Sequence, residues 1–224
     1  MFDELSHYLP RPIEAPDLPG HGASSDLPTT FESVVGLVEW LASGEPPALI
    51  GYSMGGRLAL RYALERPVAG LVLISTGPGV ANPVEREERR ISDERLAAGI
   101  ATQGVEAFID TWLGNPMFGG IAKRHEIWRA VDRETRLLSS ADGLARALVS
   151  YGQGSQPFLG DRLAQLRVPT LIVAGGDDAK YMAIARAMHR AIDGSQLVII
   201  EGVGHAVVGE DPAELGDVIS RFLY

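Results

Sequence analysis

The sequence predicts a single α/β domain, in which helices flank a mostly parallel sheet and a helical segment interrupts the chain. Three observations predict this fold class. Short apolar runs alternate with helical patterns, as in βαβ units. Most of these runs are apolar at every position, as in strands buried on both faces of a parallel sheet. From about residue 83 to residue 162 the strand pattern stops, and the sequence becomes helical and rich in charge.

The elements follow in order along the chain. Residues 1–10 are expected to form an amphipathic helix with Phe2, Leu5 and Leu9 on one face. The expected strands lie near 13–15, 48–50, 70–74, 170–174 and 196–200, and the expected helices near 31–41, 54–64, 181–191 and 213–222. We therefore divide the chain into a core, residues 1–82 and 163–224, and a helical cap, residues 83–162, inserted in the same domain.

Composition excludes several classes of protein. The 224 residues suffice for one substantial core, and their net charge of −9 argues against a nucleic-acid or anionic-membrane partner. The absence of cysteine excludes disulfides, thiolate metal sites and cysteine nucleophiles. The chain starts with acidic residues where a signal peptide would be positively charged, and its apolar runs are too short to cross a bilayer. We therefore expect a cytoplasmic protein.

The strongest local signal is the segment 51–55, Gly-Tyr-Ser-Met-Gly, which joins an expected strand directly to an expected helix. A G-x-S-x-G pattern in that context is typical of a nucleophile elbow, a strained turn that raises Ser53 above the sheet. The N-terminus of the following helix also directs the amide of Met54 at a developing oxyanion. The alternative is a tight turn whose serine only caps the helix. The strand–turn–helix context favours the nucleophile.

Such a serine needs a base, and the candidates are five histidines. His205 follows a late expected strand in a loop where Gly202 and Gly204 let the backbone bend, so its imidazole can lie over the sheet edge. His189 falls in a helical pattern typical of a surface residue, and His21 lies in a turn that could border the site. We expect His205 to be the base; the alternative is a solvated loop histidine.

The acid that orients the base is expected after the strand near 170–174. Asp177 and Asp178 are adjacent there, and either could reach an imidazole while one of them caps the next helix. The order serine, aspartate, histidine along the chain is that of the α/β-hydrolase fold.

Three segments resemble one family within that superfamily: 51–57 (Gly-Tyr-Ser-Met-Gly-Gly-Arg), 18–22 (Leu-Pro-Gly-His-Gly) and 175–181 (Gly-Gly-Asp-Asp-Ala-Lys-Tyr). Over nearly the whole chain the sequence is similar to the synthases of menaquinone biosynthesis that make 2-succinyl-6-hydroxy-2,4-cyclohexadiene-1-carboxylate (SHCHC) by eliminating pyruvate. The resemblance implies an α/β-hydrolase fold with an inserted cap. In that family the acid is the fourth residue of a G-E-x-D segment, which selects Asp178, although Gly176 stands where the family often has glutamate.

Arg57 is a candidate ligand residue on physical grounds as well. A cation near a helix N-terminus opposes the helix dipole by roughly 0.3–1 kcal/mol, which suggests an anionic ligand that offsets this term. The resemblance implies that Arg57 binds a substrate carboxylate, that Arg89 and Arg136 hold further carboxylates, and that Trp112 is the cap tryptophan. Surface salt bridges and core packing are the alternatives for these cap residues, and Arg90 competes with Arg89. We also place Tyr52 and Met54 at the site, as a substrate-binding residue and the oxyanion donor.

The function implied by the resemblance is a lyase in which Ser53, Asp178 and His205 form a proton-abstracting base. Its substrate would be a small polycarboxylate, and no metal or organic cofactor would be required. The first alternative is a serine hydrolase acting on an ester, thioester or carbon–carbon bond of an acidic metabolite. The second is a non-catalytic binding protein that retains the elbow.

The start of the chain differs from the superfamily pattern. There, a helix like 1–10 follows a strand that ends in His-Gly and donates a second amide to the oxyanion. The resemblance therefore predicts that the chain begins about 20–30 residues later than is usual, through a late start codon or a shortened form. A shortened form would lack a central strand, and its catalysis would be impaired.

Overall fold

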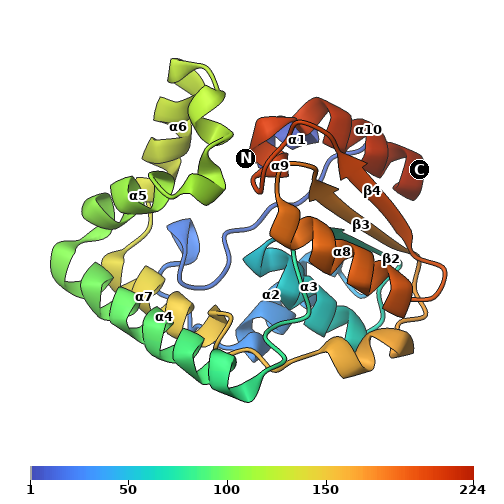
Figure 1. Ribbon diagram of the computed structural model, residues 1–224, viewed down its shortest axis with the longest axis horizontal. Helices are drawn as coiled ribbons and strands as arrows, with labels where there is room; N and C mark the ends of the chain where they lie inside the picture. Colours follow the sequence, from blue (N-terminus) through green and yellow to red (C-terminus); the bar gives the residue numbers. More distant parts are fainter. Residues whose placement is uncertain (1) are drawn as a thin grey trace.

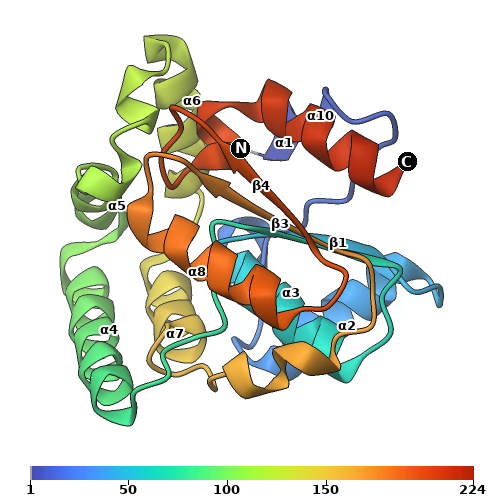
Figure 2. The same ribbon diagram turned by 45° about the vertical axis from the view of Figure 1, so that its right-hand side comes forward.

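The computed structural model describes residues 2–224, and in these residues four strands form one parallel sheet with helices on both faces (Figure 1 and Figure 2). The strands lie in chain order within the sheet, and neighbours pair as Leu49 with Leu71, Leu71 with Thr170 and Leu171 with Gln196. The carboxyl ends of all four strands therefore meet at one edge. The strands are β1 (Ala48–Tyr52), β2 (Gly70–Ile74), β3 (Thr170–Gly175) and β4 (Gln196–Ile200).

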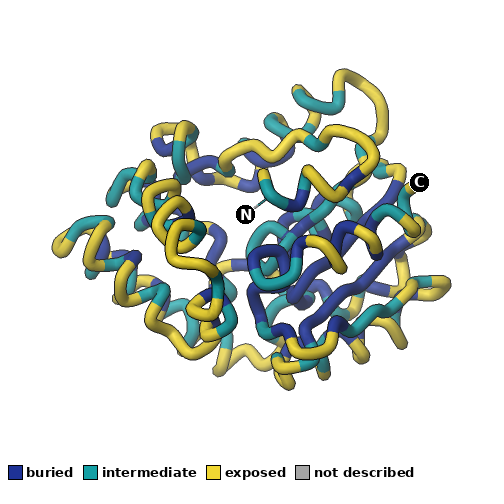
Figure 3. The backbone as a smooth tube through the Cα atoms, turned by 90° about the horizontal axis from the view of Figure 1, so that it is seen from above, coloured by how far each residue is buried: buried dark blue, intermediate teal, exposed yellow. Residues whose placement is uncertain are grey.

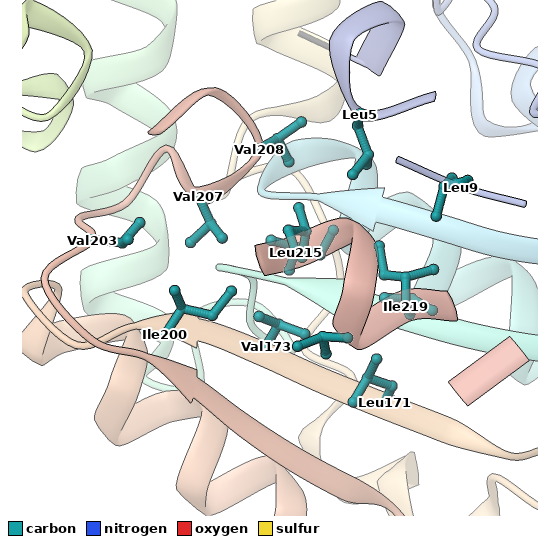
Figure 4. Packing of buried hydrophobic residues seen from close by; sticks show 13 residues of the cluster. Leu5, Leu9, Leu171, Val173, Ile200, Val203, Val207, Val208, Leu215 and Ile219 are labelled. Carbon is teal, nitrogen blue, oxygen red and sulfur yellow. The ribbon is translucent and has the colours of Figure 1, made fainter. Parts of the chain in front are cut away.

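Successive side chains of the central strands pack on opposite faces of the sheet, because side chains alternate along a strand. Val72 and Val173 pack with α1 (Phe2–Ser6), α9 (Val207–Glu210) and α10 (Pro212–Leu223), as Figure 4 shows for this cluster.

On the other face, Leu73 and Ile172 pack with α3 (Met54–Glu65) and α8 (Ala179–Ala191). Each fully buried aliphatic side chain contributes about 1.5–3 kcal/mol of hydrophobic free energy, so these two layers hold the sheet edge in place.

The link from β2 to β3 carries four helices, which lie on the opposite side of the molecule from α10 (Figure 1). The first of them begins at Pro83 and is capped by Asn82, whose Oδ1 accepts a bond from the Val84 amide at 2.9 Å. Their outward faces are exposed, whereas the central strands β2 and β3 are buried (Figure 3). They are α4 (Pro83–Gln103), α5 (Val105–Leu113), α6 (Glu126–Leu137) and α7 (Ala141–Tyr151), followed by the 3-10 segment η4 (Gly160–Gln165).

Two sets of contacts join these helices to the rest of the chain. Ala147 and Tyr151 of α7 pack in one cluster with Phe31 of α2 (Phe31–Ala42). Glu4 of α1 accepts bonds from Arg124 at 2.7 Å and from the Trp128 indole of α6 at 2.6 Å. The remaining short segments are η1 (Gly22–Ser24), η2 (Pro116–Phe118) and η3 (Ile121–Lys123).

The α/β fold class predicted from the sequence is confirmed, and four of the five expected strands are present within two residues of their expected bounds. The strand expected near 13–15 is wrong, because those residues form no strand. Pro12 and Pro16 flank the run and lack the backbone N–H that a strand needs for pairing. Ile13 only packs its side chain against the α1–α10 layer.

The expected helix over residues 1–10 is shorter in the structure. It spans Phe2–Ser6 and then gives way to turns, while Leu5 and Leu9 still face the core as expected. Met1 lies outside the described residues. The division into core and inserted cap stays a prediction. None of the helices in residues 2–224 has the length and apolar character needed to cross a membrane.

Candidate active site

Ser53 occupies the turn between β1 and α3 in a backbone conformation that residues other than glycine rarely adopt, with φ 49° and ψ −109°. Neighbouring groups hold this turn. The Ser53 amide donates to Ile74 O at 2.9 Å, and Thr76 Oγ1 donates to Ser53 O at 2.7 Å. The strained turn is therefore fixed by the end of β2, the neighbouring strand, and by the segment that follows it.

Close backbone approach explains two of the glycines around the serine. A Cβ on Gly51 would lie 2.6 Å from Gly56 Cα, and one on Gly56 would lie 2.7 Å from the Thr76 side chain. A Cβ on Gly55 would meet no atom within 4 Å outside its own helix. The steric requirement thus falls on the first glycine of the G-x-S-x-G pattern and on Gly56, the residue after the pattern.

The three residues expected to form the triad come together. His205 Nε2 lies 3.2 Å from Ser53 Oγ, and His205 Nδ1 lies 2.7 Å from Asp178 Oδ2. The other oxygen of Asp178, Oδ1, accepts the Tyr181 amide at 3.1 Å and caps α8. Asp178 is therefore both the partner of the histidine and the helix cap, and Asp177 is exposed beside it.

His205 is buried among aromatic rings. It is 3% exposed, and the ring centroids of Tyr181, Tyr52 and Phe118 lie 4.5, 5.6 and 6.2 Å from its own. Burial lowers the pKa of His205 below its usual value, and the hydrogen bond and charge of Asp178 partly oppose this shift. The imidazole is therefore neutral at pH 7 and able to accept the proton of the serine hydroxyl.

Met54 is the first residue of α3 and directly follows the serine. The N–H groups of a first helical turn have no partner inside the helix, and they carry the positive end of the helix dipole. Met54 therefore has the position expected of an oxyanion donor, and that role stays a prediction.

Arg57 is a buried cation without a carboxylate partner among residues 2–224. The residue is only 7% exposed. Its guanidinium donates hydrogen bonds to Gln156 Oε1 at 2.6 Å and to Tyr151 O at 2.8 Å. Burial lowers the pKa of Arg57 to about 10, so the side chain remains charged at neutral pH. A buried charge without an ion-pair partner is costly, which fits a group that binds an anionic ligand.

Arg89 and Arg90 have different surroundings, although the sequence alone did not show which of them lies at the site. Arg89 donates to the buried Asp93 at 2.7 Å and to Gln153 Oε1 at 2.9 Å. Gln153 Nε2 in turn donates to the Tyr181 hydroxyl at 2.9 Å, which links Arg89 to the ring against His205. Arg90 forms ion pairs with Glu87 and Glu94 on an exposed face. The geometry favours Arg89 as the site residue.

The remaining expected residues lie on the other flank of His205. Trp112 contacts Phe118 with ring centroids 5.5 Å apart, and Phe118 lies against His205. Arg136 donates to the buried Asp132 at 2.8 Å, and its charge also acts on Tyr52. The buried Tyr52 hydroxyl has no hydrogen-bond partner in the described residues, and burial raises the pKa of Tyr52.

Sequence reasoning missed three side chains of this region: Gln153, Gln156 and Tyr181. Tyr181 is the last residue of segment 175–181, but nothing in that segment indicated a role for its side chain. The two glutamines lie in a glycine-containing stretch after α7 without a recognisable motif. Their importance follows only from the partners that the fold brings to them, Arg89 and Arg57. Among residues 2–224, no group of three or more His, Asp or Glu side chains gathers as metal ligands would.

The model of the Alpha/beta hydrolase family matches residues 1–218. The chain belongs to this family. Its α/β-hydrolase fold, with a parallel sheet and flanking helices, therefore agrees with the fold predicted from the elbow and the order of the triad.

Individual relatives of this alpha/beta hydrolase carry a more specific name. A putative SHCHC synthase from Bacillus subtilis is 41% identical over 177 residues, which cover 78% of this chain and 65% of the relative, so the chain spans just under two thirds of that protein. The SHCHC synthase from Photorhabdus laumondii is 30% identical over 92% of this chain and 74% of its own length. The structure of MenH from S. aureus superimposes with a TM-score of 0.87 at 36% identity, over 92% of this chain and 81% of that one. The resemblance to the SHCHC synthases is confirmed.

Proposed function

We propose that the protein is a lyase of the SHCHC-synthase type, which eliminates pyruvate from a polycarboxylate precursor. The observation that carries this proposal is the buried, carboxylate-free Arg57 four residues after a serine that is hydrogen-bonded to a neutral histidine. A hydrolase of neutral esters needs no such cation. The names and identities of the relatives support the same activity.

In this mechanism the triad acts as a base. His205 takes the hydroxyl proton of Ser53, and the serine oxygen removes a proton from a substrate carbon. The electron pair left on that carbon moves through the ring and breaks the bond to the leaving group. The leaving group takes up the proton held by His205, which restores the neutral imidazole, and departs as pyruvate. Asp178 holds the imidazole in the required tautomer through the 2.7 Å hydrogen bond to Nδ1.

The arginines serve both binding and chemistry. A polycarboxylate needs several cations for binding, and the negative charge that develops on the substrate is stabilised by donors already in place. Arg57 is held by Gln156 and Tyr151, and Arg89 by Asp93 and Gln153, so neither has to reorganise during the reaction. Arg136 and Trp112 would contact the same substrate from α6 and α5.

The test is turnover of the menaquinone precursor, followed by coupled detection of pyruvate. We expect pyruvate release by the wild-type protein and a loss of about 10³-fold or more in kcat for Ser53→Ala, because the proton-abstracting group is removed. Ser220→Ala, a distant serine on α10, is the control and should retain the wild-type rate. A wild-type rate no higher than the uncatalysed background would overturn the proposal.

Serine hydrolysis of an acidic ester or thioester is the second candidate. The elbow geometry favours it, because a serine oxygen 3.2 Å from a neutral histidine is also equipped for nucleophilic attack. Hydrolysis requires a covalent acyl-serine, whereas the lyase does not. Trapping an acyl group on Ser53 by mass spectrometry, with no pyruvate release from the precursor, would favour the hydrolase.

A further inference from the structure

Glu210, the last residue of α9, binds the backbone of the loop that carries His205. Its Oε2 accepts the Gly204 amide at 2.8 Å, and its Oε1 accepts the Ala206 amide at 3.1 Å. The two donors are the residues immediately before and after His205. Both oxygens of one carboxylate therefore fix the backbone on either side of the catalytic imidazole.

The loop needs such a constraint. It contains Gly202, with φ 72°, and Gly204, and glycine has more accessible backbone conformations than other residues. The Val203 carbonyl accepts the Asp177 amide at 2.9 Å, which fixes the start of the loop. The Gly204 amide is held by Glu210. Hydrogen bonds to a charged acceptor are roughly twice as strong as neutral ones, so this carboxylate is a main determinant of the loop geometry.

Glu210 also contacts the inserted helices. Gly120, in the turn between η2 and η3, lies so close that a Cβ there would overlap the Glu210 carboxylate. Phe118 and Ile121 from the same turn pack against Ala206. The turn formed by residues 116–123 and the histidine loop are thus in contact through Glu210 and Ala206.

We propose that Glu210 is a positioning residue, which holds His205 in line with Ser53 and makes that alignment depend on the 116–123 turn of the inserted helices. The inference rests on the proposed function only in taking His205 as the base. It assigns to Glu210 no contact with the substrate.

The charge of Glu210 gives this role a measurable signature. The ionisable groups that face His205 are Asp178, Lys180 and Tyr181 from the start of α8, Tyr52 from β1, and Glu210 from α9. The negative charge of Glu210 raises the pKa of His205, in opposition to burial. Neutralising it should lower that pKa, whereas a loss of packing alone would open the site to water and raise it.

The test compares Glu210→Gln with the wild type. The glutamine has nearly the same shape, but it accepts through one oxygen only and presents an NH2 group to the other amide. NMR titration of the His205 ring should show a lower pKa, and the Gly204 and Ala206 amides should exchange with solvent faster. Glu201→Gln, an exposed carboxylate on the same loop, is the matched control and should change neither quantity.

In turnover of the precursor, Glu210→Gln should lower kcat by about 10- to 100-fold with KM unchanged, and move the acid limb of kcat/KM to lower pH. Gly120→Ala should lower kcat in the same direction, because its methyl group displaces the carboxylate. Glu210→Asp retains the charge and should recover part of the rate.

Wild-type values for the His205 pKa, amide exchange and kcat in Glu210→Gln would overturn the inference. An inactive wild type would instead overturn the proposed function, and the NMR measurements would still test Glu210.

Discussion

Arg57 departs from two local rules, and under the proposed function a bound anion accounts for both. It lies in the first turn of α3, where the helix dipole disfavours a cation, and it is buried without a carboxylate partner in the described residues. Both features lower stability. Its fixed bonds to Gln156 and Tyr151 leave the guanidinium oriented by protein groups, so binding an anion requires little further ordering.

Substitution of Arg57 by lysine tests whether the Arg57 guanidinium binds a substrate carboxylate. Lysine keeps the charge but cannot reproduce the planar arrangement of donors, so KM for the polycarboxylate should rise by about 10-fold or more. Steady-state kinetics with the precursor measure this change. Arg61→Lys, one turn further along the same helix and paired with Glu65 at 3.1 Å, is the matched control. Equal KM values for Arg57→Lys and the wild type would contradict the assigned role.

At the scale of elements, the strand–helix junction after β3 combines two tasks in Asp178. One carboxylate oxygen caps α8 and the other binds His205. Sequence reasoning treated these as alternatives for two neighbouring aspartates. The structure assigns both to the same residue, since the cap position of a helix that starts at the sheet edge also faces the next loop.

Asp178→Asn separates the two tasks. Asparagine caps helices as well as aspartate does, so the free energy of unfolding should change by less than about 1 kcal/mol. It cannot stabilise the imidazolium or fix its tautomer, so kcat should fall by about 10³- to 10⁴-fold. Denaturant unfolding and precursor turnover measure the two effects. A variant that loses both the cap and the activity, as Asp178→Ala should, serves for comparison. A large loss of stability in Asp178→Asn would show that the carboxylate charge itself holds the junction.

Prediction from sequence succeeded where a local pattern determines the structure, and it failed where a distant partner does. The close approach of Ser53, Asp178 and His205 was predictable because each of them follows a strand, and parallel strands end at one edge. The run near 13–15 has strand-like residues, yet no neighbouring strand pairs with it. Gln156 and Glu210 carry no local signal. Arg57, the partner of Gln156, is 99 residues away along the chain, and the bonds of Glu210 to the Gly204 and Ala206 amides depend on the conformation of the histidine loop.

For the whole molecule, burial of histidine determines how stability responds to acid. Burial lowers the folded-state pKa of both His21 and His205 below 6.5. As the pH falls, the unfolded chain therefore takes up these protons at a higher pH than the folded protein does. The free energy of unfolding is constant with respect to these two groups above pH 6.5 and decreases as the pH falls below it. Urea unfolding at pH 7.5 and 5.5 should show this decrease, and His205→Gln should reduce it. The same decrease in both proteins would contradict a buried neutral His205.

The adjacency of β2 and β3 has a consequence for how the sequence of this protein can diverge in evolution. β2 and β3 pair directly, Ile74 with Val173, so a link of nearly a hundred residues joins two neighbouring strands of the sheet. The entropy of closing a loop grows only with the logarithm of its length, by about 0.6 kcal/mol for each doubling. Inserts of very different size can therefore be exchanged at this point at small cost to the sheet. The helices that carry Arg89, Trp112 and Arg136 lie in this link. Under the proposed function, substrate choice can therefore diverge through the link while the strand ends that hold Ser53, Asp178 and His205 stay as they are.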